Sequence, residues 1–217
     1  MSKAVFTFGR MNPPTIGHEK LVNKVRAVAR AHRGDPLIYL SHTHKLPKDP
    51  LEYSYKSKIA KKAFGNIVKI TRANTIIKVL QELEKKYKEV VLVVGSDRVT
   101  DMRELITAYN GKDYTFDTIK VVSAGERDLD AVDEKETDKK KVRTVSGMSA
   151  SAMRALAAAE QLDDYTEGGS KYIGFRSGLP KMLQRDAENI MKQVRKGLNY
   201  EQYQAQGHAS LRDSIGD

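Results

Sequence analysis

Residues 4–18 read Ala4-Val5-Phe6-Thr7-Phe8-Gly9-Arg10-Met11-Asn12-Pro13-Pro14-Thr15-Ile16-Gly17-His18. The apolar run at the start is typical of a buried strand, and the amphipathic stretch 17–32 predicts a helix. A strand, a tight Gly/Pro turn and a helix N-terminus form a natural phosphate site, because free backbone N–H groups and the positive end of the helix dipole point at the ligand. The turn also carries a guanidinium, a carboxamide, a hydroxyl and an imidazole, which all suit phosphoryl oxygens.

Strand-like and helix-like runs alternate along the following residues. Further strands are predicted at 36–41, 67–71, 90–94 and 118–122, and further helices at 51–64, 75–87 and 99–108. This alternation predicts an α/β fold, a Rossmann-like parallel sheet with helices on both faces. Ligands of such sheets bind beyond the carboxyl ends of the strands. Residues 9–18 lie at one such end, and residues 95–98 lie at another.

The chain has 217 residues, which fits one large domain or one domain with an appendage. We predict that residues 1–160 form the α/β domain and that residues 161–217 form a helical C-terminal appendage. The end of this appendage, 200–217, is polar, and we expect it to be poorly ordered. Residues 126–143 are highly charged, which predicts a mobile surface loop.

Composition excludes several classes of protein. No apolar run approaches the ~20 residues that span a bilayer, so we expect no membrane association. Cysteine is absent, which removes disulfides and thiolate chemistry; with no signal-peptide layout, we expect a cytoplasmic protein. The net charge of +10 indicates anionic partners. Because the basic residues are dispersed and tryptophan is absent, the composition favours a phosphate-bearing ligand over nucleic acid.

A second polar motif, Met148-Ser149-Ala150-Ser151-Ala152-Met153-Arg154, precedes an alanine-rich run. Ser149 or Ser151 would cap the helix that this run predicts. Hydroxyls and free N–H groups at a helix start can hold a polyphosphate. Arg154 lies about one turn further along, where its guanidinium can reach the same anion.

These two motifs resemble those of a known family. Thr15-Ile16-Gly17-His18 is similar to the (His/Thr)-x-Gly-His signature of the nucleotidylyltransferase superfamily. Residues 148–154 are similar to its second signature, Ile-Ser-x-Thr-x-x-Arg, with Met148 at the Ile position and Ser151 replacing Thr. The resemblance covers roughly residues 3–160, so it implies that this part is the catalytic domain.

The resemblance implies transfer of AMP or CMP from ATP or CTP to a phosphomonoester, with release of pyrophosphate. The acceptor phosphate is already a nucleophile at neutral pH, so no general base is required. His18, Thr15 and Arg154 are the implied catalytic residues, with His18 donating to the α- or β-phosphate. The implied nucleotide-binding residues are Gly9, Arg10, Gly17, His18, Met148, Ser149, Ser151 and Arg154. Mg²⁺ would bridge phosphate oxygens and need few or no protein ligands.

The acceptor is less defined. Gly9-Arg10 and Asn12-Pro13 resemble the nicotinamide mononucleotide adenylyltransferases, although Met11 and Asn12 replace Phe and Gln of that subfamily. Phosphopantetheine, glycerol phosphate, choline phosphate and sugar phosphates stay open as acceptors. Candidate acceptor-binding residues are Lys45, Lys48 and Asp97. His42 and His44 share one loop without a third ligand nearby, so we predict no protein metal site.

An alternative is a catalytically silent Rossmann-like protein that binds nucleic acid or a protein partner through its basic surface. Thr15, His18, Ser149 and Arg154 argue against it, since nothing structural requires all four. Either hypothesis is compatible with a homo-oligomer.

Overall fold

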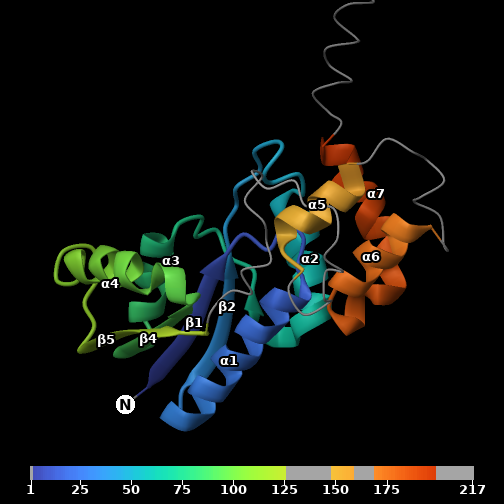
Figure 1. The fold of residues 1–217 in the computed structure, drawn as a ribbon. Coiled ribbons are helices and arrows are strands. Elements are labelled where there is room, and N and C mark those ends of the chain that lie inside the picture. The colour runs from blue at the N-terminus through green and yellow to red at the C-terminus, as the bar shows by residue number, and fades with distance from the viewer. Residues whose placement is uncertain (1, 126–147, 159–168, 199–217) are drawn as a thin grey trace, which may run out of the picture.

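The computed structural model describes residues 2–125, 148–158 and 169–198. Its five-stranded sheet has the order β3-β2-β1-β4-β5, and each pair of neighbouring strands is parallel (Figure 1). The strands are β1 (Lys3–Gly9), β2 (Asp35–Leu40), β3 (Val68–Lys69), β4 (Glu89–Val94) and β5 (Thr118–Ser123). This order confirms the predicted α/β, Rossmann-like sheet. The predictions for 126–143 and 200–217 fall outside the described residues.

The helices predicted at 17–32, 51–64, 75–87 and 99–108 are present with bounds close to these, and three further helices follow in the described residues. They are α1 (Ile16–His32), α2 (Tyr53–Phe64), α3 (Ile76–Glu84), α4 (Val99–Ala108), α5 (Ala150–Ala158), α6 (Ser170–Gly178) and α7 (Ala187–Leu198), with 3-10 turns η1 (Gly65–Ile67), η2 (Ser96–Arg98) and η5 (Lys181–Asp186). Within the described parts of the chain, no helix combines the length and apolar character needed to cross a membrane.

Strand β3 is shorter than the predicted strand at 67–71. It lies at the edge of the sheet and pairs with β2 through Val68 and Lys69. The backbone of Thr71 then turns away from β2, because its N–H and its carbonyl oxygen both bond to the hydroxyl of Tyr53. The apolar run therefore continues beyond the strand, and Ile70 is exposed.

The sheet is buried on both faces, as its apolar central strands predict. Phe6 of β1 packs in a cluster with α3 and α4, whereas Val5 points to the other face and packs with Val25 of α1. Val22 of α1 and Ala60 of α2 share a further cluster with β2. Helices α1 and α2 therefore form one layer, and α3 and α4 form the opposite layer.

Helices α5, α6 and α7 pack with α2 and the start of α1 (Figure 1). Gly178 ends α6 at a close approach, since a Cβ there would collide with the side chains of Met148 and Met153. Gly197 in α7 lies equally close to the backbone of Pro50. The helices of the predicted appendage thus support both the second motif and the loop from residue 41 to 52, which we call the β2–α2 loop.

Candidate functional site

The turn between β1 and α1 is built on buried side chains. Met11 has a left-handed φ of 45° and packs into the cluster beneath α1 and α2. Asn12 is 1% exposed. Its Nδ2 donates to the carbonyl oxygen of Leu51 (3.2 Å), and its Oδ1 accepts from the N–H of Leu51 (3.0 Å). This carboxamide suits phosphoryl oxygens by its chemistry, but both of its polar atoms tie the turn to the β2–α2 loop.

Thr15 and His18 form a capping box at the start of α1. The hydroxyl oxygen of Thr15 accepts from the backbone N–H of His18 (3.4 Å), and Nδ1 of His18 accepts from the backbone N–H of Thr15 (3.1 Å). Oγ1 and Nδ1 lie 2.9 Å apart. Thr15 is only 2% exposed. Its hydroxyl, predicted to hold a phosphate oxygen, therefore orients the imidazole.

The bond to Nδ1 determines where a neutral His18 carries its proton. A backbone N–H can only donate, so Nδ1 must present its lone pair and Nε2 must hold the hydrogen. His18 is partly exposed in the first turn of α1, where the helix dipole is positive. The Nε2–H group is thus the donor that the predicted role requires.

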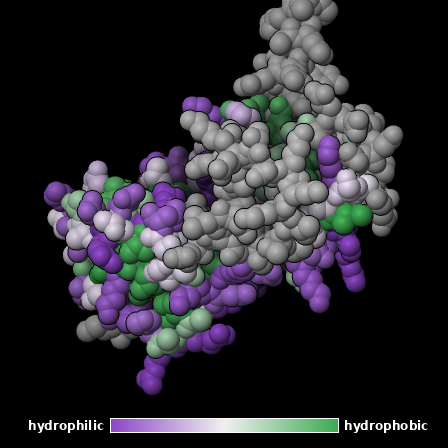
Figure 2. All heavy atoms as spheres, viewed as in Figure 1, coloured by the Kyte–Doolittle hydropathy of each residue, from purple (hydrophilic) through white to green (hydrophobic). Residues whose placement is uncertain are grey.

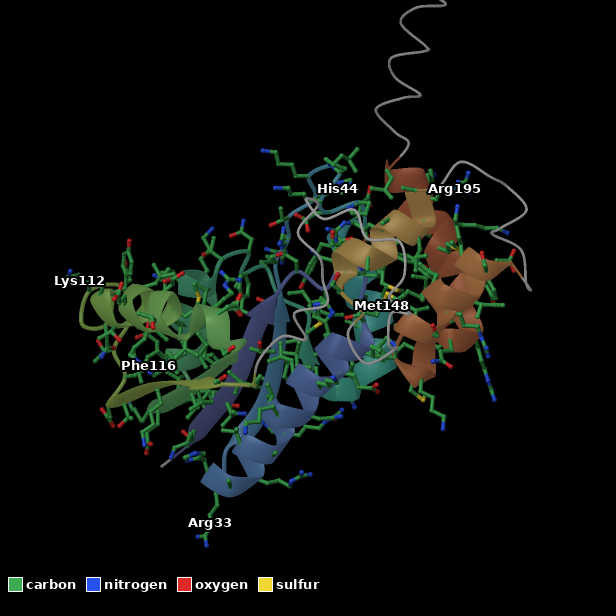
Figure 3. The ribbon with its side chains drawn as sticks, in the orientation of Figure 1. Arg33, His44, Lys112, Phe116, Met148 and Arg195 are labelled. Carbon is green, nitrogen blue, oxygen red and sulfur yellow. The ribbon has the colours of Figure 1, made fainter. Side chains whose placement is uncertain are left out.

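The second motif forms the start of α5. Oγ of Ser149 accepts from the N–H of Ala152 (3.1 Å), so Ser149 is the cap, while Ser151 is exposed. Met148 buries its side chain among the C-terminal helices (Figure 3). Its carbonyl oxygen would lie 3.8 Å from a Cβ placed on Gly17. The starts of α1 and α5 therefore meet.

Arg154 joins the two motifs directly. Its Nη1 donates to the carbonyl oxygen of Asn12 (3.0 Å), across 142 positions of sequence. Burial lowers the pKa of this guanidinium; the charge of Arg10 lowers it further and that of Asp49 raises it. Two motifs at opposite ends of the predicted domain thus converge beyond the carboxyl end of β1.

Four charged residues around this turn form what we call the charge cluster: Arg10, Asp49, Lys56 and Arg154. Nη1 of Arg10 lies 3.7 Å from Oδ2 of Asp49, whose side chain is 4% exposed against 60% for Arg10. Lys56 is fully buried, and its Nζ donates to the carbonyl oxygen of Thr43 (3.2 Å). With three cations and one carboxylate, the cluster has the excess positive charge that attracts a polyanion.

Burial lowers the pKa values of two basic groups in this region. Burial lowers the pKa of Lys56 to about 8, while Asp49 raises it and Arg10 lowers it. Burial also lowers the pKa of His42; a hydrogen bond with the Thr71 backbone raises it and the charge of Lys56 lowers it. A bound anion would favour the charged form of both groups, and shifted pKa values of this kind are typical of functional sites.

Sequence reasoning missed Asp49, because a polar loop with mixed charges is usually solvated, and it missed Lys56, because a lysine in a helix is usually exposed. One signal could have found Lys56. It precedes Ile59 and Ala60 by three and four positions, so the helical period places it on the buried face of α2. A lysine on such a face needs a partner or a ligand.

The predicted acceptor-binding residues lie on the two loops that flank β1. Lys45 and Lys48 are exposed on the β2–α2 loop, and Asp97 is exposed in η2, directly after β4. Between them, Gly9 ends β1, and no atom lies within 4 Å of a Cβ built on it. The strand order reverses between β1 and β4, where ligands of such sheets bind.

The two loop histidines do not share a site with further metal ligands. His42 stacks on Tyr53, with ring centroids 3.6 Å apart, and His44 is exposed on the loop (Figure 3). Over residues 2–125, 148–158 and 169–198, no group of three or more His, Cys, Asp or Glu could hold a metal ion.

Comparison with known proteins adds no assignment. No protein-family model matches the chain, and no curated protein matches it.

Proposed function

We propose that this protein is a nucleotidylyltransferase that transfers AMP or CMP from ATP or CTP to a phosphomonoester and releases pyrophosphate. The observation that carries the proposal is the hydrogen bond from Arg154 to the Asn12 carbonyl oxygen. With the Met148 carbonyl oxygen beside Gly17, this bond places two helix starts and the charge cluster around one point. Such an arrangement suits a triphosphate, which carries several negative charges along its length.

Catalysis by these residues is alignment and charge stabilisation. Nε2–H of His18 donates to a non-bridging oxygen of the α- or β-phosphate as negative charge develops there. Thr15 holds the imidazole in the donor tautomer. Arg154 and the N-terminus of α5 bind the β- and γ-phosphates, which leave together as pyrophosphate. The acceptor phosphate attacks directly, since it needs no deprotonation by the protein.

A divalent metal fits this site as part of the nucleotide complex. The carboxylate of the cluster, Asp49, is buried among cations and ion-paired with Arg10, so the residues suit phosphate oxygens better than a protein-held metal. Mg²⁺ supplies charge neutralisation on the triphosphate when it is bound.

The acceptor proposed first is nicotinamide mononucleotide. Met11 and Asn12, at which the turn departs from that subfamily, are each 1% exposed. Because buried side chains touch no substrate, their replacement changes the packing of the turn and leaves the acceptor open. Acceptor choice then falls to exposed residues, among which Lys45, Lys48 and Asp97 are the candidates.

Pyrophosphate release tests the proposal. The protein is incubated with ATP or CTP, Mg²⁺ and a panel of phosphomonoesters, and we expect release that depends on one acceptor. In that reaction His18→Ala should lower turnover by ~10²–10³-fold, because a transition-state donor is removed. His32→Ala, at the exposed far end of α1, is the matched control. If none of the acceptors in the panel supports pyrophosphate release, the proposal is contradicted. Full turnover by His18→Ala would also contradict it.

A second candidate, nucleic-acid binding, is favoured by one observation. Basic residues gather in the α1/α2 layer: α1 carries Lys20, Lys24, Arg26 and Arg30 against Glu19, and α2 exposes Lys58, Lys61 and Lys62. In the opposite layer, acidic residues outnumber basic ones in both α3 and α4. Hydrophilic residues dominate the exposed side of α1 in Figure 2. Salt-sensitive binding of duplex DNA without pyrophosphate release would favour this candidate.

A further inference from the structure

We propose that Asp49 and Lys56 are positioning residues: these two buried charged side chains hold the β2–α2 loop, and Asp49 aims Arg10 at a polyphosphate bound between the starts of α1 and α5. The identity of that polyphosphate as a nucleoside triphosphate rests on the proposed function. The positioning itself follows from the contacts of the two side chains.

Asp49, which forms an ion pair with Arg10, is held within the β2–α2 loop. Its backbone N–H donates to the carbonyl oxygen of Lys45 (2.8 Å), and Leu51, two residues on, is held at both polar atoms by Asn12. Arg10 is a long, mostly exposed side chain whose ion pair is with this carboxylate. Without the pair, Arg10 would extend into solvent, away from the turn.

The ion pair with Arg10 involves only one of the two carboxylate oxygens of Asp49. Its Oδ1 is buried and has no hydrogen-bond partner among the described residues. Buried polar atoms without partners are rare and call for an explanation. Here the carboxylate acts through charge: Asp49 is the anion that offsets Lys56 and Arg154, while Arg10 repels both.

Lys56 supports the same loop from inside the protein. Its Nζ bonds to the carbonyl oxygen of Thr43 near the start of the loop, and its charge attracts Asp49 near the end. A buried ammonium is costly, and an apolar side chain of similar volume is often as stable or more stable. The retention of a charge here is therefore better explained by the ligand than by folding.

The charges decide how Arg10 and Arg154 can share one ligand. Two guanidinium groups repel each other, and Lys56 adds a third positive charge. Asp49 offsets one of the three, so Arg10 can stay near Arg154 before the ligand arrives. A polyphosphate then offsets the remaining charge and binds to both arginines.

A double-mutant cycle on the full chain tests this inference, with inorganic tripolyphosphate and Mg²⁺ as the probe and calorimetry as the measurement. If Asp49 acts through Arg10, Asp49→Asn and Arg10→Ala should each weaken binding roughly tenfold, as expected when one charge-assisted hydrogen bond to the ligand is removed. The double variant should be no weaker than Arg10→Ala alone. Additive effects, or an unchanged affinity in folded Asp49→Asn, would overturn the inference.

Lys56→Met repeats the cycle in case Asp49→Asn does not fold, with Lys58→Met, on the exposed side of the same helix, as its control. We expect Lys56→Met to weaken tripolyphosphate binding, and the double variant Lys56→Met/Arg10→Ala to bind no more weakly than Arg10→Ala alone. Lys58→Met should leave the affinity unchanged. If no acceptor supports turnover but this coupling is found, the proposed function fails and the inference stands. If turnover is found but the coupling is absent, the proposed function stands and the inference fails. A wild-type protein that does not bind tripolyphosphate also overturns the inference.

Discussion

Thr15, Asn12 and Ser149 use their polar side-chain atoms on the protein itself. Thr15 orients His18, Asn12 holds Leu51, and Ser149 caps α5. The donors that we propose for a ligand are the Nε2–H of His18, the guanidinium groups of Arg10 and Arg154, and the backbone N–H groups at two helix starts. The hydroxyls and the carboxamide thus preorganise these donors, which is the arrangement that stabilises charge without reorganisation during a reaction.

The lowered pKa of Lys56 makes the free energy of unfolding depend on pH. Its pKa is about 8 in the folded protein against 10.5 for a free lysine. Below pH 8 both states carry the proton, and the folded state bears the full cost of burying the charge. Between pH 8 and 10.5 the unfolded chain binds more protons, so the free energy of unfolding rises with pH, by roughly 3 kcal/mol in all.

Lys56→Met should remove this rise. We expect the variant to be at least as stable as the wild type at pH 7, because the buried charge is gone. Urea denaturation from pH 7 to 10 measures the difference; above that range Tyr39, Tyr87 and Tyr114, whose pKa values burial raises to about 12, affect both proteins. A parallel rise in wild type and variant would show that Lys56 is not its source.

At the scale of elements, the sequence predicted helices and strands well because the apolar periods are clear. The strand 90–94 and the helix 99–108 match β4 and α4. The pattern failed at β3, where a hydroxyl from α2 takes the backbone bonds that would extend the strand. An apolar pattern indicates which residues can be buried, but it does not show whether their backbone has a neighbouring strand to pair with.

The site was predictable where the motifs are local. The turn, the cap at Ser149 and the strand end at Gly9 follow from adjacent residues. Lys56 was missed although the helical period places it on the buried face of α2. The bonds of Asn12 could not be predicted from adjacent residues, because its burial depends on the β2–α2 loop, which folds back over the turn. Such contacts join residues about forty positions apart, and composition carries no record of them.

Helix α7 acts on the site through one glycine. A Cβ on Gly197 would overlap the backbone of Pro50, beside Asp49. Gly→Ala in a helix usually stabilises by about 1 kcal/mol, but here we expect Gly197→Ala to destabilise by roughly 1–3 kcal/mol through overpacking. It should also weaken tripolyphosphate binding, because the β2–α2 loop must shift.

Gly174→Ala in α6 is the matched control. Its Cβ would lie 3.4 Å from Cδ1 of Leu156, an ordinary contact, so this variant should be as stable as the wild type or more stable. Urea denaturation and calorimetry compare the two variants. Equal behaviour of Gly197→Ala and Gly174→Ala would mean that α7 does not support the loop.

At the scale of the whole molecule, the sheet separates two surfaces of different charge. Both motifs lie at the carboxyl edge of the strands, whereas Arg30 and Lys61 are exposed near the far ends of α1 and α2. Arg26, in the second half of α1, bonds to the carbonyl oxygen of Phe64 at the end of α2, so the second half of α1 contacts the end of α2. Residues that are dispersed in the sequence are thus brought together by the fold on one basic surface, remote from His18.

This surface should bind a duplex weakly and without sequence preference, through phosphate contacts alone. The double variant Arg30→Glu/Lys61→Glu should lower the dependence of log affinity on log salt by about 2, one for each phosphate that is no longer neutralised. Lys78→Glu/Arg103→Glu changes the net charge equally on the opposite layer and should leave that slope unchanged. Fluorescence anisotropy with a short duplex at several salt concentrations makes the comparison. Equal effects of the two double variants on the slope would mean that net charge alone attracts the duplex. Neither double variant should change acceptor-dependent turnover, because neither pair of residues lies near the carboxyl edge of the sheet.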